Sequence, residues 1–174
     1  GIAASGTVAD LLVANNVLAH VPDISGFATG CANLLSGNGV ASFEFQYLVE
    51  LVTKTQFDTI YHEHYTYLSL RSVETVFEAA GLAVFDVEEL PTHGGSLRVY
   101  AQRADSGRHR VESSVHRIRS EEEVAGVASP SFYAGFQTRA ERIKDQFLLR
   151  LREVSADGQR IGGYGAAAKG NTLL

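Results

Sequence analysis

The sequence predicts an α/β fold whose sheet is mainly parallel and closes with an antiparallel pair of strands. Three observations support this: a short apolar run near the start, alternating helical and strand patterns up to residue 89, and two final strand patterns separated only by a turn. Strands that alternate with helices form parallel sheets with right-handed crossovers, whereas strands joined by a short turn pair antiparallel.

The first half of this sheet follows from apolar periodicity. The continuous apolar run at 10–14 predicts a buried parallel strand. Apolar residues at helical spacing across 23–35 predict a helix that ends at Gly37 and Gly39. Apolar and polar residues alternate across 40–47, which is typical of a strand with one face more exposed to solvent.

The second half contains a helix and a hairpin. Residues 58–70 are rich in aromatic and histidine side chains without clean periodicity, so we expect a loop that carries chemistry. Residues 72–80 have a helical pattern that Gly81 ends. The strand patterns at 83–89 and 96–102 flank a turn with paired glycines, which predicts an antiparallel hairpin.

The rest of the chain is expected to connect this sheet to a second domain. Residues 103–126 are polar and charged, which indicates a surface connection or an exposed helix. Ser129–Pro130 has the pattern of a helix start, and apolar residues at steps of three or four across 132–154 predict one long amphipathic helix. A short strand at 160–164 and a glycine-rich turn follow.

Composition excludes several classes of protein. The chain has 174 residues, of which 45% are hydrophobic and 20% charged, as in a soluble globular protein. No apolar run approaches the roughly 20 residues of a membrane helix. The net charge of −5 argues against nucleic-acid binding, and the single cysteine excludes an internal disulfide and a Cys-only zinc site. We expect a cytoplasmic protein, and an incomplete one, because the chain starts at Gly1 without any methionine.

The densest group of chemically active side chains is Tyr61-His62-Glu63-His64-Tyr65. His-x-His can chelate a metal, although zinc catalysis normally needs a third protein ligand. The same residues suit a polar surface loop with packed aromatics. They also suit acid–base catalysis, in which Glu and Tyr orient a histidine. The spacing alone leaves all three interpretations open.

Three further segments are candidate binding elements. His20 follows the first strand, at the sheet edge where α/β proteins bind ligands, although it also suits a helix start. The segment from His93 to Arg98 is either a simple turn or a loop that offers N–H groups, the Ser96 hydroxyl and a guanidinium to a phosphate or sugar. The glycine-rich turn before Lys169 resembles an anion-binding helix start, but it matches neither the P-loop nor G-x-G-x-x-G.

Four segments together resemble one family. They read LLVANNVLAHVPD, FEFQYLVELVTKTQFDTIYHEHYTYLSL, ELPTHGGSLRVYAQR and GGYGAAAKGNTLL, in this order. This sequence is similar to the S-adenosylmethionine-dependent sugar C-methyltransferases, which make branched deoxysugars for antibiotics and include the C-3′-methyltransferases of dTDP-4-keto sugars. The resemblance implies a zinc-binding module upstream, none of whose zinc ligands are in this chain, a central class I (Rossmann-like) methyltransferase domain and a C-terminal Rossmann-like domain.

The resemblance also implies domain limits. Residues 1–106 would be the C-terminal part of the methyltransferase domain, with its antiparallel edge hairpin. Residues 107–157 would be a connecting helical segment. Residues 158–174 would contain the first strand and turn of the C-terminal domain that binds the nucleotide sugar.

The implied reaction removes the C-3 proton of a 4-keto sugar, and the enolate carbon then attacks the methyl group of S-adenosylmethionine. His64 would be the base, Tyr61 and Glu63 would orient it and bind the sugar, and His20 would lie by the C-4 oxygen. Asn15 and Asn16 would approach the cofactor. The expected substrate-binding residues are His93, Ser96, Arg98, Tyr164 and Lys169. A methyltransferase for another atom or substrate, and a non-catalytic nucleotide-binding module, remain alternatives.

Overall fold

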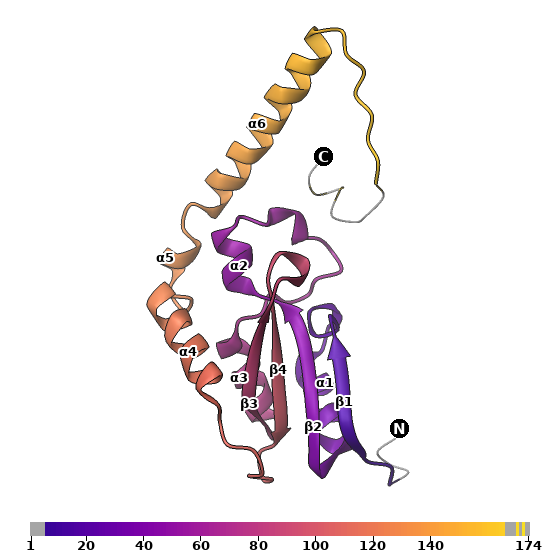
Figure 1. Cartoon of the computed structure of the whole chain (residues 1–174), viewed down its shortest axis with the longest axis vertical. Coiled ribbons are helices and arrows are strands. Elements are labelled where there is room, and N and C mark those ends of the chain that lie inside the picture. Colours follow the sequence, from indigo (N-terminus) through magenta and orange to yellow (C-terminus); the bar gives the residue numbers. More distant parts are fainter. Residues whose placement is uncertain (1–5, 166–169, 171, 173–174) are drawn as a thin grey trace.

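The computed structural model describes residues 6–165, 170 and 172. It contains a four-stranded sheet of β1 (Ala9–Asn15), β2 (Leu35–Gln46), β3 (Leu82–Leu90) and β4 (Ser96–Arg103), in the order β1-β2-β4-β3. β1 and β2 are parallel, and β4 is antiparallel to both of its neighbours. The last strand is therefore inserted between β2 and β3 (Figure 1), and the predicted α/β class with an antiparallel edge hairpin is confirmed.

Helices cover one face of this sheet (Figure 1). α1 (Ile24–Leu34) and α3 (Leu70–Ala79) pack against each other, and α3 also contacts β3. The core beneath them contains the fully buried side chains of Phe43, Phe45 and Phe77, and the rings of Phe43 and Phe77 lie 4.7 Å apart. Burial of such aromatic side chains is a main source of stability and fixes where the strands end.

The start of α3 is held by two sets of contacts. The hydroxyls of Ser69 and Ser72 form a capping box. The carboxylate of Glu122 accepts hydrogen bonds from the backbone N–H groups of Leu70 and Arg71, at 2.6 and 3.0 Å. These contacts satisfy donors that a helix start otherwise leaves without partners.

The expectation that the first strand is buried is wrong for one of its faces. Leu11 and Val13 are 65% and 60% exposed, whereas Ala14 is buried against the helices. β1 is an edge strand, and the described residues cover only one side of the sheet. An apolar run shows that a strand can be buried on both faces, but not that a covering layer is present.

β2 begins earlier than expected, and the side chains of its polar face are less exposed to solvent than expected. Gly37 and Gly39 lie inside the strand instead of ending the preceding helix. A Cβ atom at Gly39 would lie 2.7 Å from the carbonyl oxygen of Ala9, so close approach of two strands requires this glycine. The polar residues Ser42 and Glu44 are buried because neighbouring side chains cover them.

The polar segment after the hairpin contributes to the core. α4 (Ser113–Ala125) packs on β3 and α3, and its Val115 and Ile118 are fully buried. The prediction of an exposed helix is therefore wrong for its inner face. Val115 and Ile118 lie three positions apart and form a narrow buried stripe, while Val124 on the same helix is exposed.

The expected long helix is interrupted, and the strand expected after it is absent. α5 (Pro130–Tyr133) begins with the predicted Ser129 cap, and α6 (Phe136–Ala156) starts after Gly135, whose φ of 75° breaks the helix. Ala140 is its one buried residue, and Figure 1 shows α6 leading away from the sheet. Residues 160–164 are exposed and form no strand, since a strand needs a hydrogen-bonding neighbour.

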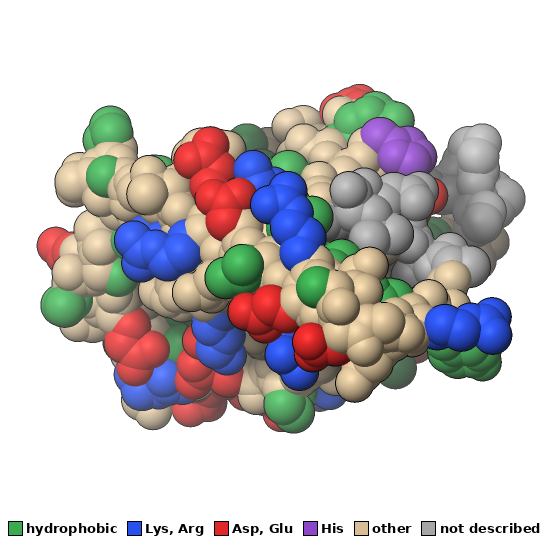
Figure 2. All heavy atoms as spheres, turned by 90° about the horizontal axis from the view of Figure 1, so that it is seen from above, with side chains coloured by type: hydrophobic (Ala, Val, Ile, Leu, Met, Phe, Trp, Pro, Cys, Tyr) green, Lys and Arg blue, Asp and Glu red, His purple; other side chains and the backbone are tan. Residues whose placement is uncertain are grey.

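The remaining shorter elements of the described residues are α2 (Leu48–Thr53) and the 3₁₀ turns at Leu18–His20, Phe57–Thr59 and Thr92–Gly94. None of the described helices is long and apolar enough to span a membrane. Acidic and basic side chains intermingle on the face shown in Figure 2 and do not form one basic patch.

Candidate functional site

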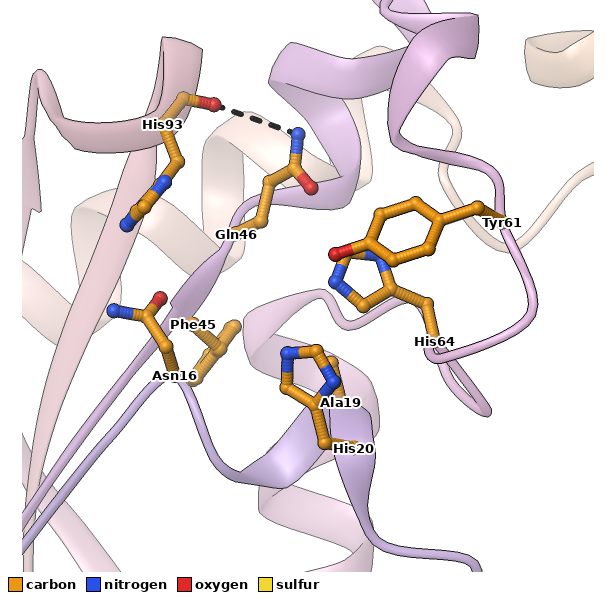
Figure 3. A pocket seen from close by; sticks show the side chains of 8 residues that line it. All are labelled: Asn16, Ala19, His20, Phe45, Gln46, Tyr61, His64 and His93. Atoms are coloured by element: carbon orange, nitrogen blue, oxygen red, sulfur yellow. Dashed lines mark hydrogen bonds between the residues drawn. The ribbon is translucent and has the colours of Figure 1, made fainter. Parts of the chain in front are cut away.

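A small pocket lies at the carboxyl ends of β1 and β2 (Figure 3), which is the edge of an α/β sheet where ligands bind. Its volume is about 130 Å³. It is lined by Asn16, Ala19, His20, Phe45, Gln46, Tyr61, His64 and His93. The structure therefore brings four separate sequence segments together, and four of the lining residues are histidine or tyrosine candidates from the sequence.

The end of β1 turns sharply to form one wall. Asn16 has a φ of 55°, and its N–H donates to the carbonyl oxygen of Glu44 at 2.7 Å. The short turn at Leu18–His20 follows, and the fully buried Leu18 anchors it. Asparagine tolerates this left-handed conformation better than most residues, so the local sequence favours the turn.

The loop that carries the histidine cluster is tied to this turn. The N–H of Tyr65 donates to the carbonyl oxygen of Ala19 at 2.8 Å, and the hydroxyl of Thr66 reaches the carbonyl oxygen of Leu18 at 3.4 Å. These bonds cross about 45 residues of sequence. They hold the rings of Tyr61 and His64 over the turn.

The backbone sets the tautomer of His64. Its Nδ1 lies 2.8 Å from the carbonyl oxygen of Thr59. Because a carbonyl oxygen only accepts, Nδ1 carries the proton in this bond, and the basic nitrogen of the neutral ring is Nε2. Thr59 is itself 2% exposed, and its hydroxyl donates to the carbonyl oxygen of Gln56 at 2.8 Å. The ring is thus oriented by a rigid, buried turn.

His20 is fixed in the same way. Its Nδ1 lies 3.0 Å from the carbonyl oxygen of Glu63, so Nε2 is the second nitrogen of this ring as well. The rings of His20 and His64 are 4.8 Å apart in an edge-on arrangement. The two imidazoles therefore lie side by side at the same wall of the pocket.

Tyr61 stacks on the other side of His64, with 4.5 Å between the ring centroids. Burial and the negative charge of Glu63 raise the pKa of Tyr61 above its ordinary value. Its O–H therefore stays protonated at neutral pH and is available as a hydrogen-bond donor. Tyr61 and the histidine pair place one donor and two imidazoles around the same space (Figure 3).

The other residues of the cluster point away from the pocket. The side chain of His62 is 84% exposed and lies 4.0 Å from that of Glu63, which is 54% exposed. Glu63 orients His20 through its backbone carbonyl, whereas a role of its carboxylate toward a sugar stays a prediction. Among the described residues, no group of three or more His, Cys, Asp or Glu side chains could hold a metal.

The β3–β4 turn forms the remaining wall through His93, whose φ is 54°. Two residues predicted beside it lie outside the pocket and already have partners. The buried hydroxyl of Ser96 donates to the carbonyl oxygen of Thr92 at 3.0 Å, and Arg98 donates to the buried carboxylate of Glu44 at 2.8 Å. These contacts shape the turn, and substrate binding by Ser96 and Arg98 stays a prediction.

The last candidates are placed as follows. Asn15 is exposed at the end of β1, beside the pocket rather than in its wall. Tyr164 is fully exposed after α6. Lys169 lies outside the described residues.

Sequence reasoning missed Gln46, Gln56 and Thr59. Gln46 is the last residue of β2, so the carboxyl end of a predicted strand was a usable signal. Gln56 and Thr59 act through contacts with residues distant in the sequence, which no local pattern indicates.

Comparisons with known proteins show similarity to methyltransferases. Residues 91–174 match the family described as C-methyltransferase C-terminal domain. The chain is 42% identical over 173 residues to the C-methyltransferase NovU of Streptomyces niveus, which covers 99% of this chain. In the solved structures, magnesium protoporphyrin IX methyltransferase (ChlM) of Synechocystis PCC 6803 with bound SAH covers 59% of this chain and 48% of its own, with a TM-score of 0.44 and 16% identity.

Residues 91–174 therefore match a C-methyltransferase family, and nearly the whole chain is similar in sequence to a C-methyltransferase. The expected resemblance to C-methyltransferases is confirmed at that level. The chain spans 41% of the length of NovU.

Proposed function

We propose that the protein to which this chain belongs transfers a methyl group from S-adenosylmethionine to C-3′ of a nucleotide-linked 4-keto deoxysugar through an enolate. The observation that carries this proposal is the orientation of His64, whose Nδ1–H is bound to the carbonyl oxygen of Thr59 while the ring lines the pocket. A base held in one tautomer at the wall of a pocket suits removal of a proton from carbon.

The pocket can also stabilise the enolate. Deprotonation next to a ketone places negative charge on the carbonyl oxygen, and a preorganised donor lowers that barrier. Tyr61 supplies a protonated O–H for this charge, and His20, whose ring lies 4.8 Å from that of His64, is the second residue placed to contact the oxygen.

The lining favours a neutral, hydroxyl-bearing ligand. None of its eight residues is Asp, Glu, Lys or Arg. A sugar ring satisfies amides, imidazoles and a phenol without burying an unpaired charge. We therefore propose that the diphosphate lies outside this pocket, with Lys169 and Tyr164 as its expected contacts.

The pocket and its neighbouring residues would contact only one side of S-adenosylmethionine. A pocket of about 130 Å³ is smaller than the 300–1,000 Å³ typical of whole-ligand sites. Asn16 lines it and Asn15 is exposed next to it, so both asparagines would approach the cofactor across the open end of β1. The bound cofactor would supply an electrophilic methyl group on sulfonium.

The test uses the full-length enzyme with S-adenosylmethionine and a dTDP-4-keto-6-deoxyhexose. We expect a product with a new methyl group on C-3′, located by NMR, and a His64→Ala variant about 10²–10⁴-fold lower in kcat. A methyl group on C-5, the other carbon next to the ketone, would correct the position. A methyl group on oxygen or nitrogen, or binding of dTDP without S-adenosylhomocysteine binding, would replace the proposal with one of the two alternative functions.

A further inference from the structure

Gln46 occupies a position in the pocket that the proposed chemistry does not yet use. It is the last residue of β2, and its partly buried side chain lies between His93 and the histidine pair (Figure 3). Its Nε2 lies 2.9 Å from Oε1 of Gln56 and 3.5 Å from the carbonyl oxygen of His93.

The surrounding hydrogen bonds determine which way this amide faces. The carbonyl oxygen of Gly94 can only accept, and Nε2 of Gln56 donates to it at 2.8 Å. Oε1 of Gln56 must then be the atom that faces Gln46, so Gln46 must present its NH₂ group to Gln56. A reversed Gln46 amide would bring two oxygens together. The carbonyl oxygen of Gly94 therefore determines the orientation of both side-chain amides.

The consequence concerns the opposite end of the Gln46 amide. Its NH₂ group is directed at Gln56 and His93, so Oε1 is the atom it offers to a ligand. In Figure 3 this oxygen points to the space shared with Tyr61 and His64. An amide oxygen attracts a hydroxyl and repels a carbonyl oxygen.

We propose that Gln46 determines substrate specificity by accepting a hydrogen bond from a sugar hydroxyl on the reacting carbon or on the carbon next to it. This inference rests on the proposed function. The contact excludes orientations that place the ketone against Gln46, and it turns the ketone toward Tyr61 and His20. Gln56 is a positioning residue that acts through Gln46.

The test compares three substrates: a dTDP-4-keto-6-deoxyhexose and its 2-deoxy and 3-deoxy analogues. Gln46→Leu in the full-length enzyme should lower kcat/KM for the parent sugar about five- to thirtyfold, the worth of one hydrogen bond to a polar group. For one of the two analogues, the same variant should lose less than twofold, because the hydroxyl that Gln46 binds is already missing. Gln56→Leu should produce the same selectivity more weakly.

A matched control is Gln102→Leu. Gln102 is another buried strand glutamine, and its amide bonds to the backbone of His109, away from the pocket. This variant should reduce thermal stability without changing the ratio of kcat/KM values among the three sugars. Equal losses for all three sugars in Gln46→Leu, or no loss, would overturn the role of Gln46. Failure of the wild-type enzyme to methylate any of the sugars would instead refute the proposed function.

Discussion

Replacing Arg98 with alanine should destabilise the protein by about 2–3 kcal/mol at pH 7. Arg98 donates to Glu44 at 2.8 Å, and the glutamate side chain is only 6% exposed. Breaking a fully buried ion pair costs about 3–5 kcal/mol, because one charge is left without a partner. Here the hydroxyl of Thr92 still donates to the second carboxylate oxygen at 3.0 Å, which reduces the expected cost.

The ion pair between Arg98 and Glu44 should also make the folding stability of the protein depend on pH. Burial alone would raise the pKa of Glu44, but the hydrogen bonds from Arg98 and Thr92 outweigh it and lower this pKa below its ordinary value. A carboxyl whose folded-state pKa is lowered contributes stability above its unfolded pKa of about 4.3 and loses it as the pH falls through the folded value. The variant lacks the main partner that lowers this pKa, so its stability deficit should narrow below about pH 4.

Urea denaturation followed by circular dichroism at pH 7 and pH 3 measures both effects. Arg103→Ala is the control, because Arg103 binds Asp105 with similar geometry at an exposed site and should leave the unfolding midpoint nearly unchanged. A loss below about 0.5 kcal/mol for Arg98→Ala at pH 7, or a deficit that is the same at both pH values, would refute this reasoning.

Two further substitutions test the contacts that shape the fold around the pocket. Glu122→Ala leaves the two N–H groups at the start of α3 without their carboxylate, so it should cost about 2–4 kcal/mol, and an unchanged melting temperature would contradict that role. Gly94→Ala places a Cβ atom 2.5 Å from Nε2 of Gln56 at a φ of +83°, whereas Gly81→Ala meets nothing within 4 Å at a φ of +79°. Both variants should lose about 1–2 kcal/mol of folding stability, because alanine disfavours the left-handed conformation, and Gly94→Ala should lose more. Equal losses in the two variants would show that the contact with Gln56 is unimportant.

The sequence predicts the order of helices and strands along the chain and the antiparallel hairpin, because these depend on local periodicity. It does not predict exposure, which depends on neighbouring layers: β1 has its apolar residues Leu11 and Val13 exposed. It also does not predict the interruption of the long helix, although Gly135 lies at the break. A helical pattern indicates which residues share a face, and a partner is needed to bury that face.

The candidate site, like the fold, can be predicted from the sequence only in part. Residue type is enough to select the cluster at 61–65, and position at the sheet edge selects His20; the structure brings the rings of His20, Tyr61 and His64 together. The orientation of those rings depends on backbone carbonyls at Thr59 and Glu63, and a sequence pattern does not show which carbonyl a side chain meets. The choice of His64 over the exposed His62 as the base therefore came from the family resemblance.

Exchange of the C-3 proton of the sugar tests the central claim, that His64 is the base. The full-length enzyme is incubated in deuterated water with a dTDP-4-keto-6-deoxyhexose and without S-adenosylmethionine, and NMR follows the C-3 proton signal. We predict exchange by the wild-type enzyme, a rate about 10²–10⁴-fold lower for His64→Ala, and a nearly unchanged rate for His62→Ala, whose side chain points to solvent. Exchange by the His64→Ala variant at the wild-type rate would contradict the account.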